Sequence, residues 1–169
     1  GKVNLSEMEK NGLLVHVDLE TMYIDKIKSS FDLDAIKNSG LHFAYDAMYG
    51  AGQFVMKKIF PDMSFLHCDY NPSFDGQAPE PIAKNLNPFS KFIKNNGEIA
   101  AGLATDGDAD RIGLFDEKGD FVDSHHILLL LLLYLHKYKS MNGKVVVAAS
   151  TTPRAVSYTH LRAHETCLD

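Results

Sequence analysis

A short acidic segment is the part of the sequence best suited to chemistry. Between Thr105 and Arg111, three aspartates stand at alternate positions, separated by a glycine and an alanine that add little bulk: Asp106, Asp108 and Asp110. A loop of this kind can turn three carboxylate oxygens toward one cation, and oxygen ligands favour a hard ion such as Mg²⁺ over Zn²⁺. The segment therefore predicts a site for a divalent cation.

Arg111, which ends the segment, indicates which kind of ligand would bind next to the cation. Its planar guanidinium is a fork of hydrogen-bond donors that matches phosphate. The charges of the three aspartates are balanced by a divalent cation and Arg111 together, so a phosphate dianion can approach without a large standing repulsion. This combination of residue types favours phosphoryl chemistry.

Three other interpretations of the acidic segment remain open. One is a solvated acidic turn, although three carboxylates without a counter-ion repel one another. Another is a calcium loop of the EF-hand type, because the three aspartates and Glu117 occupy its first, third, fifth and twelfth positions; Arg111, however, stands where that loop needs glycine. A haloacid-dehalogenase-like phosphatase loop fits less well, because Asp110 occupies the position of its threonine or valine.

The elements that must position this segment alternate between strands and helices. Helices are predicted at 20–38, 52–60, 84–94 and 125–139. Strands are predicted at 13–17, 42–45, 63–67, 99–104, 112–115, 120–122 and 145–149, so that the acidic segment directly follows a strand. The alternation predicts an α/β fold, a three-layer α/β/α sandwich with a mixed, mostly parallel sheet.

Other groups of residues have plain structural interpretations. Asp123 or Ser124 is predicted to cap a helix whose first turn carries His125 and His126, and the pair His67 and Cys68 is assigned a similarly ordinary role.

The glycines Gly50 and Gly52 could form a phosphate-binding turn at a helix N-terminus, but the full glycine pattern of such turns is missing. Close packing of the helix on a strand is the favoured role for both glycines.

Three motifs together resemble one enzyme family. The segment from Asp106 to Arg111 resembles the DGDxDR magnesium signature of the phosphohexomutases, the superfamily of phosphoglucomutase and phosphomannomutase. The sequence YDAMYGAG at 45–52 resembles the family's glycine-bearing turn between a strand and a helix, and 79–86 resembles its PEP…NL segment. The resemblance covers residues 20–152. In the family this stretch is the second of four domains, so the resemblance implies that the chain is a fragment.

The resemblance implies an enzyme, an intramolecular phosphotransferase that interconverts hexose 1-phosphate and hexose 6-phosphate through a phosphoserine enzyme and a hexose 1,6-bisphosphate. Asp106, Asp108 and Asp110 would ligate Mg²⁺. Arg111 would be the catalytic residue, acting on phosphate by positioning and charge stabilisation. The family's phosphoserine loop, sugar-specificity loop and last domain do not occur in the sequence, so the fragment is expected to be inactive alone, with its hexose undetermined. The alternative is a non-catalytic module that binds Ca²⁺ or Mg²⁺.

The two ends of the chain do not share the central pattern. Residues 1–19 are expected to be the end of a preceding domain or a linker, and 153–169 a non-native or disordered tail. A metal site made of His160, His164 and Cys167 is the alternative for the tail, but few apolar residues are present to anchor it. The central domain is expected to contact the missing domains of the same protein.

Composition excludes several other partners. The chain has 17 Lys and Arg against 22 Asp and Glu and lacks a basic cluster, which argues against nucleic acid and anionic membranes as partners. The longest apolar run, 127–134, is too short to cross a bilayer, and burial against a sheet or a neighbouring domain is expected for its leucines. Cys68 and Cys167 are too few for a disulfide framework, which favours a cytoplasmic location.

Overall fold

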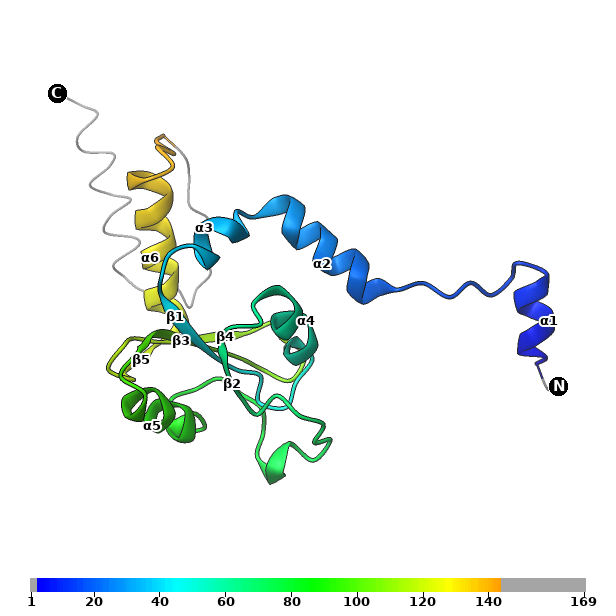
Figure 1. The fold of residues 1–169 in the computed structure, drawn as a ribbon, viewed down its shortest axis with the longest axis horizontal. Helices are drawn as coiled ribbons and strands as arrows, with labels where there is room; N and C mark the ends of the chain where they lie inside the picture. The colour runs from blue at the N-terminus through cyan, green and yellow to red at the C-terminus, as the bar shows by residue number, and fades with distance from the viewer. Residues whose placement is uncertain (1–2, 144–169) are drawn as a thin grey trace.

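A five-stranded mixed sheet forms the centre of the molecule (Figure 1). The computed structural model describes residues 3–143. The strand order is β2-β1-β3-β4-β5, in which β1 (His42–Asp46) pairs in parallel with β2 (Ser64–Leu66) and β3 (Ile99–Thr105). The strands β4 (Ile112–Phe115) and β5 (Phe121–Val122) continue the sheet in antiparallel fashion. The predicted α/β class with a mixed sheet is confirmed.

Helices cover both faces of this sheet because successive side chains of a strand point in opposite directions. On one face, Ala44 of β1 belongs to a core that includes Phe89 and Ile93 of α5 (Asn87–Asn95). On the other face, Tyr45 belongs to a smaller core to which Met56 of α4 (Gly52–Ile59) contributes. The result is the three-layer arrangement that the alternation of elements predicted.

Three of the six α-helices in residues 3–143 begin where an aspartate side chain caps the first turn. The helices α2 (Leu19–Ser30), α3 (Leu33–Lys37) and α6 (Ser124–Lys137) have Asp18, Asp32 and Asp123 as their N-caps, each of which accepts a hydrogen bond from a backbone N–H of the first turn. The helix α1 (Leu5–Lys10) is capped by Asn4 in the same way. These boundaries are local properties of the sequence.

Three of the predicted elements differ in the structure. The helix predicted at 20–38 is two helices, because the Asp32 side chain accepts from the N–H of Ala35 and starts α3. The helix predicted from residue 84 begins at Asn87, with Pro88 in its first turn, where no N–H is needed. The strand predicted at 13–17 is wrong: this segment pairs with no strand within residues 3–143. The predicted strand at 145–149 lies outside the described residues, as does the tail.

The segment at 13–17 imitates a strand because its apolar residues alternate. Leu13, Val15 and Val17 are between 62% and 73% exposed, so no sheet edge covers this row. Figure 1 shows the reason: α1 and the following residues extend away from the sheet. Alternation alone therefore does not distinguish a paired strand from an unpaired extended segment.

The leucine-rich helix α6 is less buried than expected. None of its residues is buried in the described structure, and Leu130, Leu131 and Leu133 are each more than half exposed. No helix among residues 3–143 is both long and apolar enough to cross a membrane.

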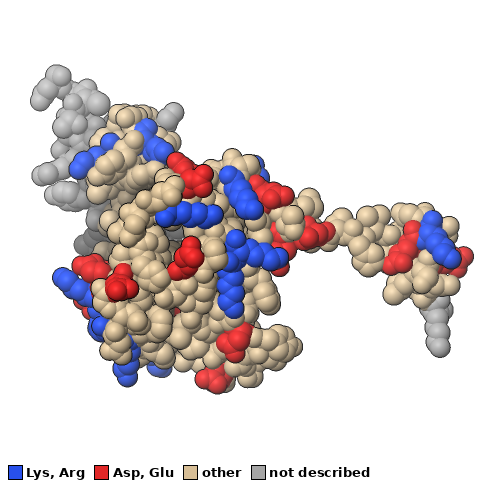
Figure 2. All heavy atoms as spheres, in the orientation of Figure 1, with Lys and Arg blue, Asp and Glu red and all other residues tan. Residues whose placement is uncertain are grey.

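On the face drawn in Figure 2, positive and negative side chains are interspersed, without a broad patch of either sign.

Candidate metal centre

The acidic segment lies at the carboxyl end of β3, beside the end of β1. It forms the connection between β3 and β4, and it is closed by two hydrogen bonds between its ends: the N–H of Asp106 donates to the carbonyl of Arg111 at 3.3 Å, and the N–H of Arg111 donates to Oδ1 of Asp106 at 2.9 Å. In open α/β sheets, ligands bind outside the carboxyl ends of the strands. The segment therefore occupies the edge of the sheet where a ligand is expected.

The three aspartates come together as the sequence predicts. One carboxylate oxygen from each of Asp106, Asp108 and Asp110 lies within 4.8 Å of the others; Asp106 is buried, and the other two are exposed. Two ligands at about 2.1 Å from one Mg²⁺ ion are at most about 4.2 Å apart. A small inward movement of the exposed side chains is therefore enough to fit such an ion.

The backbone of the segment is tight at Ala109. Its N–H donates to the carbonyl of Asp106 at 3.1 Å, and its φ of 63° lies in the left-handed region that residues with a Cβ seldom adopt.

Electrostatics distinguish the buried carboxylate from the exposed ones. Burial acts to raise the pKa of Asp106, but hydrogen bonds from the backbone and guanidinium of Arg111 outweigh it and lower this pKa to about 2. The negative charge of Asp108 and the contact with Asp106 raise the pKa of Asp110. Asp106 is thus held as an anion, while the exposed pair repel each other in the absence of a cation.

Arg111 is held from two sides. Its Nε donates to Oδ2 of Asp106 at 2.7 Å, and its Nη1 lies 3.5 Å from Oε1 of Glu80; the Asp106 hydrogen bond is the main cause that raises the pKa of Arg111. The side chain is still 58% exposed, so part of the guanidinium faces solvent. The arginine is therefore oriented by protein carboxylates and accessible to a ligand.

Glu80 is a site residue that sequence reasoning missed. It lies in the PEP segment, far from Arg111 in the sequence, and only its place in a motif could have suggested a functional role. With Glu80, the site has four carboxylates against the three positive charges of a divalent cation and Arg111, which leaves one negative charge in excess. The sequence predicted that these charges balance.

The acidic segment is packed directly against the turn that follows β1. A Cβ added to Gly50 would lie 2.6 Å from the carbonyl oxygen of Asp106 and 2.8 Å from that of Gly107, and the N–H of Ala51 donates to the carbonyl of Gly107 at 3.0 Å. Only glycine allows this approach of two backbones. Close packing of the helix on a strand was predicted for this glycine; the structure shows close packing, but its partner is the acidic segment.

The second glycine of this turn accommodates a tyrosine. A Cβ on Gly52 would overlap the hydroxyl of Tyr45, which forms a hydrogen bond of 2.6 Å with Oγ1 of Thr105, the last residue of β3. Burial raises the pKa of Tyr45 to about 12. The hydroxyl of Tyr45 therefore ties the base of the acidic segment to β1.

Among the described residues, the histidines that the sequence pairs with ordinary roles each lie next to a carboxylate. The carboxylate of Asp123 accepts hydrogen bonds from the N–H groups of His125 and His126 at 3.0 Å each, which confirms the predicted helix cap. His67, for which an ordinary role was also predicted, contacts the buried carboxylate of Asp46 through Nδ1.

Comparison with known proteins shows which class of domain combines this mixed sheet, covered by helices on both faces, with an acidic segment after a central strand. The family model of phosphoglucomutase/phosphomannomutase α/β/α domain II matches residues 21–119. The chain belongs to this family.

Individual relatives are mutases of different names. The chain is 33% identical over 121 residues to a phosphopentomutase of Thermococcus kodakarensis, covering 69% of this chain and 26% of that protein. It is 33% identical over 141 residues to a phosphoglucosamine mutase of Thermodesulfovibrio yellowstonii, covering 82% and 31%.

A solved structure described as a phosphomannomutase from Thermus thermophilus superposes with a TM-score of 0.65 at 31% identity, covering 72% of this chain and 29% of that one. The chain thus spans between about a quarter and a third of the length of these relatives.

Proposed function

We propose that the chain is the metal-binding domain of a phosphohexomutase that interconverts hexose 1-phosphate and hexose 6-phosphate, with residues 20–152 as the domain. The observation that carries this proposal is the convergence of three carboxylates, one of them buried, at the end of β3 in a chain of this family. The fragment is inactive alone in this proposal, and the hexose phosphate or bisphosphate binds the intact cytoplasmic enzyme.

Each residue of the acidic segment has a separate part in the proposal. Asp108 and Asp110 are exposed and adjust to the cation, whereas Asp106 is held as an anion by Arg111 and presents a fixed oxygen. A bound Mg²⁺ supplies positive charge where a phosphoryl group is transferred. Arg111 would contact the same phosphate, which is supported by its partly exposed guanidinium and by the contacts with Asp106 and Glu80 that hold it.

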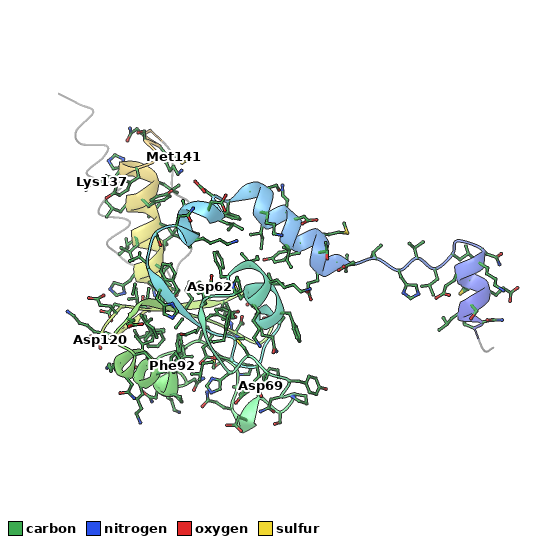
Figure 3. All side chains as sticks on the ribbon, in the orientation of Figure 1. Asp62, Asp69, Phe92, Asp120, Lys137 and Met141 are labelled. Carbon is green, nitrogen blue, oxygen red and sulfur yellow. The ribbon has the colours of Figure 1, made fainter. Side chains whose placement is uncertain are left out.

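The first test is magnesium binding by the chain, measured by calorimetry. Asp108→Asn is expected to weaken Mg²⁺ binding by at least about tenfold, because a neutral amide replaces one of three carboxylate ligands. The matched control is Asp62→Asn, an exposed aspartate in the turn before β2, at the opposite end of that strand from the carboxyl edge (Figure 3). Equal affinities for the two variants would contradict the assignment of the metal ligands.

The second test separates the mutase from a non-catalytic cation module. In the intact parent enzyme, Asp108→Asn is expected to abolish turnover while the fold survives. A variant that loses stability in the presence of metal but keeps full activity per folded molecule would favour the non-catalytic alternative.

A further inference from the structure

A pocket lies beside the acidic segment and is not used by the proposed function. Its volume is about 100 Å³, and its walls come from the turn after β1, from His67 after β2 and from the loop that precedes α5. Phe74 and Pro79 line this pocket, and their side chains hold the atoms nearest to a Cβ added at Gly107, so they separate the pocket from the acidic segment. We refer to it as the His67 pocket.

Backbone strain is concentrated around the His67 pocket. Within residues 3–143, seven residues other than glycine have a positive φ, and five of them line this pocket: Met48, Tyr49, His67, Phe74 and Asp75. Such conformations are costly and persist where the surrounding structure enforces them, which occurs most often at ligand sites. The concentration of strain therefore marks the pocket as a candidate binding site.

The imidazole of His67 is held in one orientation. Its Nδ1 lies 3.0 Å and 2.9 Å from the two carboxylate oxygens of Asp46, which is only 1% exposed and also accepts a hydrogen bond from the N–H of Met48 at 2.8 Å. The ring also packs against Tyr49, with 4.9 Å between centroids. Because Nδ1 must donate to the carboxylate, Nε2 is the nitrogen left for a ligand, and it has no hydrogen-bond partner within the described residues.

The charges around the imidazole decide which ligand fits. Three carboxylates act on His67, those of Asp46, Asp69 and Asp75, so an anion would meet excess negative charge. A hydroxyl group suits the site better, because it accepts from Nε2 when the ring is protonated and donates to Nε2 when it is neutral. A hydroxyl also donates to the Asp75 carboxylate on the pocket wall.

The walls supply apolar surface next to these polar groups. Phe74 and Met48 line the pocket together with the carboxylate and imidazole. We propose that the His67 pocket binds a small uncharged ligand with several hydroxyl groups, such as a sugar ring or another polyol, through Nε2 of His67 and the carboxylate of Asp75. The proposal goes beyond the proposed function, because it uses none of the residues of the acidic segment.

The test is a titration of the chain followed by NMR, with methyl α-D-glucopyranoside as the probe and labelled methionine methyl and histidine ring positions as reporters. A saturable shift of the Met48 methyl and His67 ring signals is expected, with a Kd in the millimolar range, as for a small ligand with few contacts. Inorganic phosphate is titrated separately. No saturable shift with the glucoside, or saturation of the same signals by phosphate alone, would overturn the proposal.

Two matched variants test the residues. Asp75→Asn removes a pocket carboxylate and keeps a residue that tolerates positive φ, so the fold is preserved while the glucoside binds at least about threefold more weakly. Asp69→Asn removes a carboxylate that acts on His67 but does not line the pocket, and it leaves the affinity unchanged. Equal losses in both variants would contradict direct binding.

A third variant separates this proposal from the proposed function. Asp108→Asn weakens magnesium binding but is expected to leave the glucoside titration unchanged. Loss of glucoside binding in this variant would show that the two sites are one and would overturn the proposal, whatever its effect on magnesium.

Discussion

The acidic segment and the His67 pocket both lie at the carboxyl ends of parallel strands, yet they are built in opposite ways. Each contains a buried aspartate that is 1% exposed and accepts a hydrogen bond from a backbone N–H of its own turn. In the segment, the cationic partner of Asp106 is Arg111, five residues away; in the pocket, the partner of Asp46 is His67, 21 residues away. A buried aspartate is thus paired with a neighbour in the sequence in the acidic segment, and with a residue from the end of another strand in the pocket.

The two partners also differ chemically. A guanidinium stays protonated at every accessible pH, whereas an imidazole titrates near neutrality. We therefore expect the acidic segment to depend on cations and the His67 pocket to depend on pH.

The largest effect is expected at the residue that joins the two regions. Gly50→Ala places a Cβ against the carbonyl oxygens of Asp106 and Gly107, which are backbone atoms and cannot turn away. We expect a loss of about 3 kcal/mol in the free energy of unfolding, measured by urea denaturation, and weaker magnesium binding. The control is Gly97→Ala, where a Cβ meets nothing within 4 Å. Similar stabilities of the two variants would refute the close approach.

A smaller effect, confined to the acidic segment, is expected from the tyrosine at its base. Gly52→Ala alone is destabilising, because the new Cβ overlaps the hydroxyl of Tyr45. Tyr45→Phe alone costs about 1 kcal/mol, because the hydrogen bond to Thr105 is lost. In the double variant the overlap is relieved, because the hydroxyl is gone. The losses in the free energy of unfolding of the two single variants should therefore add up to about 1 kcal/mol more than the loss measured for the double variant. Simple additivity would contradict this packing.

The pH dependence should distinguish the two regions. The hydrogen bond to Asp46 raises the pKa of His67 above its ordinary value, and burial opposes this less strongly. Protonation therefore stabilises the fold below the unfolded pKa of about 6.5, and this contribution is lost as the pH rises through the higher folded pKa. Urea denaturation of the wild-type chain and of His67→Gln across this pH range measures this contribution. An equal dependence of the free energy of unfolding on pH in both proteins would exclude the His67–Asp46 ion pair as its source.

The smallest effect is expected for Asp108→Asn, whose effect on Tm should change sign when Mg²⁺ is added. Without metal, Asp108→Asn is expected to raise Tm by about 1 °C, because it removes the carboxylate that raises the pKa of Asp110 by repulsion. With saturating Mg²⁺ the wild-type chain is expected to be the more stable protein, because it binds the cation more tightly. Calorimetric melting curves with and without Mg²⁺, and with EDTA to remove the metal, test this; the same order under both conditions would count against a cation site.

The comparison also explains which predictions from the sequence succeeded. The convergence of the three aspartates, the strand before them and a helix cap at Asp123 or Ser124 were predicted because neighbouring residues determine each of them; the structure selects Asp123. The strand at 13–17 was predicted wrongly, because its alternation has the period of a strand but no partner strand lies beside it within the described residues.

The sequence by itself determined the order of the strands from β1 to β5, the aspartate helix caps and the three carboxylates of the acidic segment, since these depend on backbone preferences and spacings of a few residues. The tertiary structure alone decided that Glu80 reaches Arg111, that Gly50 touches the acidic segment and that His67 meets Asp46. These contacts join residues far apart in the chain, and they arise only when parallel strands bring their carboxyl ends to one edge of the sheet.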